Sequence, residues 1–412
     1  MNGVAVVTVA MTAMLPMAAF ELPAPTGRYP VGTTSWHVID PARRETFTAS
    51  GELRQVEVLA WYPAASRGDM LAPYLRGGLA EVRSFATLFG VPPNSFDDLA
   101  GVKTHSTLDA PPATSGRKLP VLLFSHGYTG IPSAYTALLE DLASHGYAVL
   151  SVVHPYEASG ATLEDGRVVT LLDPAGKLLP GVADVFSEWG PEDQTMAAVT
   201  STTDPAEQMR LLRGYLAGLN KTHAALRRWA DDTKVVLDRL SSIPAKSVAG
   251  RLAARLDGRR VGVFGHSMGG VTAGQFCVDD ARCAAGLNLD GIPQSGTMID
   301  KPLSRPFLMV YSARPGRLGA SDPIYQRAAR PYYRVDVADT RHLDFSDMAL
   351  WGGPLRQRPV LGPIDPVRAN AITTEIVRQY FDQELLGRRS ALLAGTSRLP
   401  EVAVKTFPAA AR

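Results

Sequence analysis

The alternation of buried strands and amphipathic helices is the feature that most constrains how this chain can fold. The segment LPVLLFSHG (119–127) is an apolar run ending in glycine, and YAVLSVVHP (147–155) is a second such run. Between them, PSAYTALLEDLASHG (132–146) carries apolar residues at helical spacing, so the three segments predict a strand, a helix and a strand. Such a unit forms a parallel strand pair with a right-handed crossover. We therefore expect a sheet with helices on both faces.

The same alternation returns in the second half of the chain. The run RRVGVFGHS (259–267) predicts a strand that leads into a helix over 269–280. Further strands are predicted over 284–291, 306–313 and 332–340, a closing helix over 365–386, and a leading antiparallel pair over 29–40 and 53–64. The total is about eight strands, most of them parallel, in one α/β domain over 27–387.

Two long segments interrupt this alternation. Residues 66–117 are rich in Pro, Gly and Asp, and residues 156–254 contain turn-rich sequence followed by long helical stretches. A structureless loop of such length is uncommon in a compact domain. We expect both segments to be insertions that fold over the carboxyl edge of the sheet and form a lid or cap.

The two ends of the chain differ from the domain between them. Residues 1–20 are apolar from Val4 to Phe20 and are followed by a proline-rich stretch, a pattern typical of a secretory signal peptide. The run is short for a membrane span, which needs about 20 continuous apolar residues. We therefore expect a secreted or periplasmic protein, and a loosely held tail over 388–412.

Charge and cysteine content narrow the class of protein. A formal net charge of +2 with 20% charged residues leaves no basic excess to attract nucleic acid. The sequence has two cysteines, Cys277 and Cys283, and two thiols alone cannot form a structural zinc site, which usually has four ligands. A disulfide between them fits an exported protein, and two small buried side chains are the alternative.

The sharpest chemical signal is the motif GHSMG (265–269), which lies between a predicted strand and a predicted helix. A serine hydroxyl becomes a good nucleophile when a tight strand-to-helix turn exposes it beside a base, and small neighbours permit the strained backbone. The pattern alone is short, but here it occupies the structural context that the motif requires. We therefore assign Ser267 as the nucleophile.

The partners of Ser267 follow from chain order, which in such sheets is serine, acid, histidine. Of the eight histidines, His342 alone lies C-terminal to Ser267, so His342 is the expected base. Asp290 directly follows a predicted strand, and Asp322 lies in the loop after the next one, where the acid most often stands. Asp344 is too close to the histidine in sequence to orient it. The residues alone favour Asp290 and leave Asp322 open.

An acyl-transfer site also needs hydrogen-bond donors for the oxyanion. The backbone N–H of Met268, directly after the nucleophile, is the first candidate. The second donor is expected from the loop that follows the strand ending near Ser125, and we assign it to the N–H of Tyr128. His126 lies in the same loop, where we expect it to fix the loop by hydrogen bonds rather than to act as a base.

These residues resemble those of the plasma-type platelet-activating-factor acetylhydrolases and their bacterial relatives among the carboxylic ester hydrolases. The segment 120–154 is similar to that family's oxyanion strand and loop, the following helix and the next strand, and GHSMGG (265–270) matches its nucleophile turn. WYPA (61–64) resembles an early strand of the family. The spacing from Ser267 to Asp290 matches its placement of the acid after the sixth strand, so the resemblance implies Asp290 as the acid. It covers most of 29–347 and is weakest across the insertions.

The resemblance implies the α/β-hydrolase fold, no metal or organic cofactor, and hydrolysis of short or lipid-derived esters through an acyl-enzyme. We expect a small-molecule or lipid ester as substrate, transient contact with a lipid surface, and no nucleic-acid partner. The same triad would also serve an amidase, a thioesterase or a polyester hydrolase, because leaving-group preference lies in the pocket. A non-catalytic binding protein on this scaffold would ordinarily have lost a triad residue, and all three are present.

Overall fold

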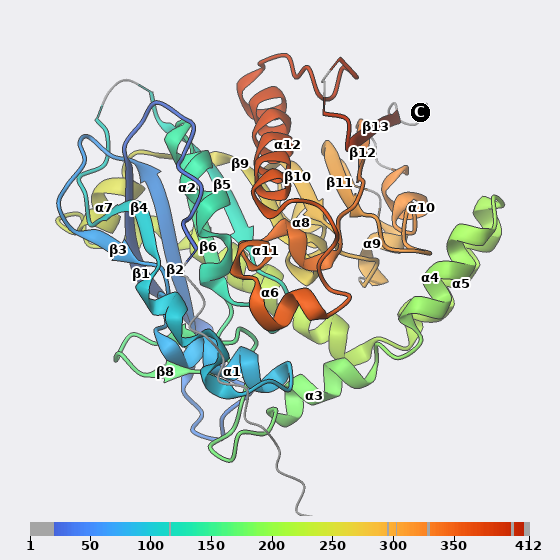
Figure 1. Cartoon of the computed structure of the whole chain (residues 1–412), viewed down its shortest axis with the longest axis horizontal. Helices are drawn as coiled ribbons and strands as arrows, with labels where there is room; N and C mark the ends of the chain where they lie inside the picture. Colours follow the sequence, from blue (N-terminus) through green and yellow to red (C-terminus); the bar gives the residue numbers. More distant parts are fainter. Residues whose placement is uncertain are drawn as a thin grey trace, which may run out of the picture.

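One large twisted sheet forms the centre of the molecule (Figure 1). The protein, represented by a computed structural model, is described over residues 20–114, 117–294, 296–301, 303–327, 330–396 and 399–407. The eleven strands of the sheet are β1 (Val31–Arg44), β2 (Leu53–Pro63), β3 (Leu71–Pro73), β4 (Lys103–Leu108), β5 (Leu119–Ser125), β6 (Ala148–Val153), β9 (Leu256–His266), β10 (Cys283–Leu289), β11 (Phe307–Ser312), β12 (Tyr332–Val337) and β13 (Val402–Phe407). Their order is β13-β12-β11-β10-β9-β5-β6-β2-β1-β4-β3. A separate two-stranded sheet pairs β7 (Ala161–Thr162) with β8 (Val168–Val169).

The parallel centre of the sheet brings the functional loops to one edge. Strands β6, β5, β9, β10, β11 and β12 pair in parallel, so their carboxyl ends face the same way. The register sets Ser125 opposite Gly265, and His266 opposite Leu289. The residues that follow β5, β9 and β10 therefore emerge side by side, as expected for ligand sites in open α/β sheets.

Helices cover both faces of the sheet and fill the insertions. The α-helices are α1 (Leu79–Leu88), α2 (Thr136–Ser144), α3 (Pro180–Ser187), α4 (Glu192–Ser201), α5 (Pro205–Ala217), α6 (Asn220–Asp238), α7 (Val248–Ala253), α8 (Met268–Asp279), α9 (Gly296–Asp300), α10 (Asp322–Tyr325), α11 (Met348–Trp351) and α12 (Pro366–Leu386). The short 3₁₀ helices are η1 (Pro93–Gly101), η2 (Pro132–Tyr135), η3 (Leu240–Ser242), η4 (His342–Phe345) and η5 (Gly353–Gln357). Helices α2 and α12 pack on one face, and α6 and α8 pack on the other (Figure 1).

Helix α12 shows how local sequence sets an element of this fold. The side chain of Asp365 accepts a hydrogen bond from the N–H of Arg368 and so caps the first turn. Gly387 ends the helix in the left-handed conformation, with φ 69°, which glycine adopts without steric cost. Between these caps, Ile376, Phe381 and other apolar residues pack on the sheet. The expected closing helix is therefore present with its expected ends.

The α/β-hydrolase fold class expected from the sequence is confirmed, with more strands than expected. The additional strands come from two regions. The segment 66–117 contains β3 and β4, which extend the sheet beyond β1. The C-terminal region contains the third, β13.

The expectation of a loosely held tail over 388–412 is wrong for the part that the structure describes, because β13 pairs antiparallel with β12 and Leu392 is buried. Its pattern was missed because β13 is a short, half-exposed edge strand that carries a lysine, as edge strands often do.

The segment 156–254 contains β7, β8 and the helices α3 to α7. Helix α6 lies against the sheet, whereas α4 and α5 extend away from it at the right of Figure 1. The expected signal peptide falls on residues 1–20, of which 1–19 lie outside the described residues. Among the described residues, no helix is both long and apolar enough to cross a bilayer.

The two cysteines form a disulfide between the end region of α8 and the start of β10. Cys277 and Cys283 are bonded, with their Cα atoms 5.1 Å apart. The expected pairing is therefore confirmed. The bond closes the short connection between the helix that follows Ser267 and the strand that leads to Asp290, so it ties together two elements of the site described next.

Candidate active site

Ser267 occupies a strained turn between β9 and α8. Its backbone has φ 56° and ψ −125°, a left-handed conformation that few non-glycine residues adopt. The N–H of Ser267 donates to the carbonyl of Leu289 at 2.8 Å, which fixes the turn against β10. Gly269 is required here because a Cβ at that position would lie 2.1 Å from the Ser125 carbonyl oxygen. This geometry is the strand-turn-helix arrangement that exposes a nucleophilic serine.

His342 and Asp290 meet beside this turn. Asp290 directly follows β10 and His342 begins η4 after β12, and His342 Nδ1 lies 2.7 Å from Asp290 Oδ2. The backbone N–H and the hydroxyl of Ser312 donate to the same carboxylate at 2.7 and 2.9 Å. The carboxylate accepts a hydrogen bond from Nδ1–H of His342. The Nε2 atom of the neutral imidazole therefore carries no proton and can accept one.

The charge on Asp290 is maintained despite its burial. Burial alone would raise the pKa of this carboxyl, but the hydrogen bond and charge of His342, together with the Ser312 N–H, bring its pKa below the ordinary value. The carboxylate is therefore ionised at neutral pH. It can orient the imidazole and stabilise the imidazolium that forms when His342 takes a proton.

The two alternative acids are engaged elsewhere. Asp322 accepts hydrogen bonds from Tyr311 and Tyr332 at 3.0 and 2.6 Å and pairs with Arg334 at 2.8 Å. Asp344 accepts hydrogen bonds from the backbone N–H groups of residues 341 and 362, so it fixes the loop that carries His342. The structure therefore brings Asp290, and neither alternative, to the base.

The two proposed oxyanion donors are free to bind a ligand. Within the part of the chain that the structure describes, the backbone N–H groups of Met268 and Tyr128 have no hydrogen-bond acceptor. The loop around Tyr128 is held by its neighbours, since Gly130 N–H donates to the Gly127 carbonyl at 2.8 Å. Nδ1–H of His126 donates to the same carbonyl at 2.7 Å. His126 thus fixes the loop, as its position in the sequence suggested.

Two residues that the sequence did not single out hold the loops of the site together. Nε2–H of His266 donates to the backbone carbonyl of His342 at 2.8 Å, and its Nδ1 accepts from the Tyr135 hydroxyl at 2.9 Å. The same hydroxyl accepts from Gly127 N–H at 3.4 Å. Burial, with the neighbouring His342, lowers the pKa of His266 to about 3, so the ring stays neutral. Its place in the GHSMG motif was the available signal, but the partners are distant in sequence.

A cavity of about 400 Å³ opens onto these residues. Ser267 and His342 line it together with Tyr128. Most of the remaining wall is apolar, and its residues come largely from the two insertions and from the region after β12. They are Phe85, Leu88, Phe89, Phe186, Trp189, Leu343 and Met348, with Arg358 as the charged residue. A mostly apolar cavity with a few convergent polar groups is the usual form of a small-molecule site.

The described residues do not offer a metal-binding cluster. No group of three or more His, Cys, Asp or Glu side chains in the described ranges is arranged to hold an ion. The polar residues that line the cavity include Ser267 and His342, whose hydroxyl and imidazole are parts needed for acyl transfer.

Comparisons with known proteins find similarity to esterases. A family model described as platelet-activating factor acetylhydrolase, isoform II, matches residues 17–165. A platelet-activating factor acetylhydrolase from Cavia porcellus is 27% identical over 187 residues, which are 43% of this chain and 36% of that protein. A probable 1-alkyl-2-acetylglycerophosphocholine esterase from Arthroderma benhamiae is 21% identical over 306 residues, 69% of this chain and 65% of that protein. The chain thus spans about a third of the length of the first of these relatives.

Among solved structures, a ferulic acid esterase from Streptomyces cinnamoneus matches with a TM-score of 0.70 and 27% identity, covering 94% of this chain and 99% of that one. Sheet topology, the strained turn and this likeness define the chain as an α/β-hydrolase. Within that class it is similar to the platelet-activating factor acetylhydrolases, which confirms the resemblance stated from the sequence.

Proposed function

We propose that this protein is a serine carboxylic ester hydrolase with Ser267 as nucleophile, His342 as base and Asp290 as the acid that orients the base. The observation that carries the proposal is that Ser267 on its strained turn and His342, bound to Asp290 at 2.7 Å, line one cavity. The esterases named among the relatives and the solved structure support the same reaction class.

The geometry leads to a two-step mechanism. His342 Nε2 takes the proton of the Ser267 hydroxyl as its oxygen attacks the ester carbonyl, and Asp290 stabilises the imidazolium. The N–H groups of Met268 and Tyr128 bind the tetrahedral oxyanion, and each such donor lowers the barrier by about 3 to 4 kcal/mol. The protonated His342 then gives its proton to the leaving alcohol. Water repeats the cycle on the acyl-enzyme and releases the acid.

The shape of the cavity supports small esters as substrates. A volume of about 400 Å³ suits a short acyl chain or one aromatic acid. Six Phe, Tyr and Trp side chains line it, namely Phe85, Phe89, Tyr128, Tyr135, Phe186 and Trp189. Flat rings of a substrate would stack on such walls, and the structural neighbour is an esterase for ferulic acid, an aromatic acid. An ester of an aromatic acid is therefore a second candidate substrate beside the acetyl esters of the relatives.

A chain-length series tests this function. Hydrolysis is measured for p-nitrophenyl esters from acetate to palmitate and for methyl ferulate, with Ser267→Ala as the matched control. We expect the fastest turnover with the short esters or with methyl ferulate, and loss of turnover in Ser267→Ala. Activity that survives Ser267→Ala would refute the mechanism, and an optimum at palmitate would refute the small-ester assignment.

We also propose that the protein works outside the cytosol. The apolar run from Val4 to Phe20 supports export, and the disulfide between Cys277 and Cys283 supports an oxidising compartment. Contact with a lipid surface would follow only if lipid esters are the substrates. Expression in a bacterial host, fractionation and N-terminal sequencing of the product test the export. Retention in the cytosol with residues 1–20 intact would contradict it.

A further inference from the structure

A second Ser–His–Asp arrangement lies buried beneath the oxyanion loop, the segment 126–130. His154 Nδ1 lies 2.9 Å from Asp232 Oδ2, and His154 Nε2 lies 3.3 Å from the Ser125 hydroxyl. Both His154 and Asp232 are 0% exposed and Ser125 is 4% exposed. No substrate can reach this hydroxyl, and none of the three residues lines the cavity of the active site. The arrangement therefore has a role other than direct catalysis.

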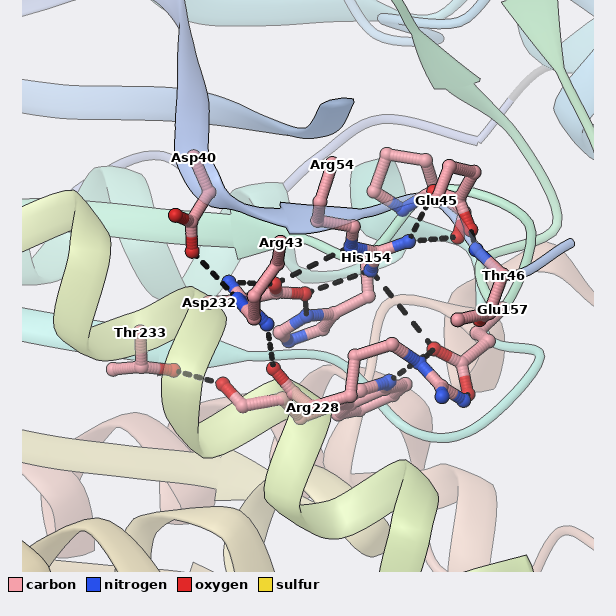
Figure 2. A network of polar contacts seen from close by, with 12 residues as sticks. Asp40, Arg43, Glu45, Thr46, Arg54, His154, Glu157, Arg228, Asp232 and Thr233 are labelled. Atoms are coloured by element: carbon pink, nitrogen blue, oxygen red, sulfur yellow. Dashed lines mark hydrogen bonds and ion pairs between the residues drawn. The ribbon is translucent and has the colours of Figure 1, made fainter. Parts of the chain in front are cut away.

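Asp232 is the centre of a network that joins the insertion to the sheet. Figure 2 shows its carboxylate on α6 between Arg43, Arg54 and His154. Arg54 donates from Nη2 at 2.7 Å and Arg43 from Nη2 at 2.8 Å. Burial would raise the pKa of Asp232, but the charge of Arg54 and the bond from His154 hold it well below the ordinary value. The carboxylate is thus ionised and fully hydrogen-bonded.

His154 connects Asp232 to the oxyanion loop. The ring of His154 stacks on Trp229 of α6 with centroids 3.9 Å apart, so its position is set by α6 on two sides. The backbone N–H of His154 donates to His126 Nε2 at 3.3 Å. Because Nε2 accepts this bond, His126 carries its proton on Nδ1, which donates to the Gly127 carbonyl at 2.7 Å. That carbonyl belongs to the peptide whose N–H is the Tyr128 donor.

Glu157 makes a second connection from α6 to the same loop. Its carboxylate accepts from Arg228 at 2.8 and 2.6 Å and from Trp229 Nε1 at 3.0 Å. Its backbone carbonyl accepts from the Thr129 N–H at 2.8 Å. Thr129 has φ 59°, so the loop turns sharply directly after Tyr128. Both sides of the Tyr128 peptide are therefore fixed by residues that α6 holds.

We propose that Asp232 and His154 are positioning residues that hold the oxyanion loop so that the Tyr128 N–H points at the reacting carbonyl. The inference rests on the proposed esterase function and adds to it a role for the inserted helix α6 in turnover. Neither residue touches the substrate. The pair acts through His126 and the Gly127 carbonyl, and its effect should appear in the transition state rather than in substrate binding.

Two substitutions of His154 separate this role from a general loss of structure. His154→Asn keeps a donor at the place of Nδ1 and can still bind Asp232, whereas His154→Gln loses that donor and retains one near Nε2. Both variants remove the same stacking on Trp229. Asp232→Asn removes the carboxylate directly, and Asp231→Asn, on the adjacent exposed residue of α6, is the matched control.

The measurements are kcat and KM for p-nitrophenyl acetate and inhibition by phenylboronic acid, a probe that forms a tetrahedral adduct with a serine. We expect His154→Gln and Asp232→Asn to lower kcat about tenfold to a hundredfold, with KM within about twofold, since misplaced catalytic groups act at this scale. Phenylboronic acid should bind more weakly by a similar factor. His154→Asn should recover most of the loss, and Asp231→Asn should behave as the wild type.

Each other result overturns the proposal. Wild-type kcat in His154→Gln would show that the bond to Asp232 does not set the loop. An equal loss of kcat in His154→Asn and His154→Gln would show that Asp232 and His154 have only a structural role. A loss that disappears when kcat is calculated per folded molecule would show the same. If Asp232→Asn does not fold, the comparison of His154→Asn with His154→Gln still tests the proposal. Ser267→Ala separates the two proposals, because its inactivity beside a fully active His154→Gln would leave the esterase function standing and the inference refuted.

Discussion

Two Ser–His–Asp arrangements lie among the described residues, and they differ in access and in charge. Ser267 and His342 line a cavity of about 400 Å³, whereas Ser125 and His154 are enclosed by the sheet and by α6. Ser267 has φ 56° on its turn, whereas Ser125 is the last residue of the regular strand β5. The same three side-chain types can therefore serve chemistry at one place and hold the chain in position at another.

The charges around the two histidines explain the difference further. Asp290 pairs with His342 and accepts hydrogen bonds from Ser312, and the more distant charge of Arg314 is a smaller cause of its lowered pKa. Asp232 is already neutralised by Arg43 and Arg54. Burial lowers the pKa of His154, and the charge of Arg54 lowers it further against the opposing effect of Asp232. The carboxylate beside His342 therefore has no arginine ion pair among the described residues, whereas the one beside His154 has two.

The largest expected effect separates the two serines. Ser267→Ala should lower kcat roughly a millionfold because it removes the nucleophile, whereas Ser125→Ala removes one long hydrogen bond to His154 and should change kcat by less than about tenfold. Rates of p-nitrophenyl acetate hydrolysis by both purified variants check this contrast. Comparable losses in the two variants would show that the distinction drawn from access is wrong.

The next effect concerns the acid of the accessible arrangement. Asp290→Asn should lower kcat about ten-thousandfold, because the imidazole loses its orienting carboxylate and the stabilisation of its charge. Asp322→Asn loses bonds to Tyr311 and Arg334 and should lower stability while leaving kcat per folded molecule nearly unchanged. The readouts are kcat and thermal unfolding, and the reverse pattern would make Asp322 the acid.

The buried arrangement should be most visible in stability against acid. The pKa of Asp232 is lowered in the folded state, so its carboxylate stabilises the fold above the unfolded pKa, and this stability is lost as pH falls below about 4. Asp232→Asn should cost about 3 to 5 kcal/mol at neutral pH and should flatten the fall of the unfolding free energy below that pH.

Denaturant unfolding at a series of pH values measures this slope. Asp290→Asn provides the comparison, because the pKa of Asp290 is lowered as well but the carboxylate pairs with a single histidine. We expect it to flatten the curve less than Asp232→Asn does. An unchanged acid slope in Asp232→Asn would mean that its charge does not support the fold.

The smallest effect concerns the hydroxyl that links the loops of the active site. Tyr135→Phe leaves His266 Nδ1 without its donor and Gly127 N–H without its acceptor. We expect a loss of about tenfold in kcat, in line with one buried hydrogen bond. Tyr62→Phe removes a hydroxyl bonded to the Ala110 carbonyl at 2.7 Å and is the control. Equal kcat in both variants would remove Tyr135 from the account of the site.

The accessible arrangement could be anticipated from the sequence, and the buried one could not. Ser267 lies in a local motif whose neighbours on both sides have clear strand and helix patterns. His342 follows from chain order alone, and the residues favoured Asp290 over Asp322 before the family resemblance strengthened that preference. His154 and Asp232, in contrast, are 78 residues apart, and one of them lies in an insertion without a family pattern. Long-range pairing of this kind leaves no periodicity in the sequence.

The strand count shows the same limit at the level of the fold. Strands β6 and β11 are buried along their whole length and are nearly continuous apolar runs, and most of β5 and the second half of β9 are buried in the same way. Strand β13 alternates partly buried and exposed residues at the edge of the sheet and is short, so nothing in its composition distinguishes it from a tail. Burial on both faces is therefore what made the parallel centre predictable.

The assignment of Ser267, rather than Ser125, as the nucleophile is tested most directly by the mass of the protein during turnover. The enzyme is mixed with p-nitrophenyl acetate, quenched in acid within the first turnovers and digested, and the peptides that carry Ser267 and Ser125 are compared by mass spectrometry. We expect one acetyl group on the Ser267 peptide and none on the Ser125 peptide. Acetylation of Ser125, or hydrolysis without any acetyl group on Ser267, would contradict this assignment.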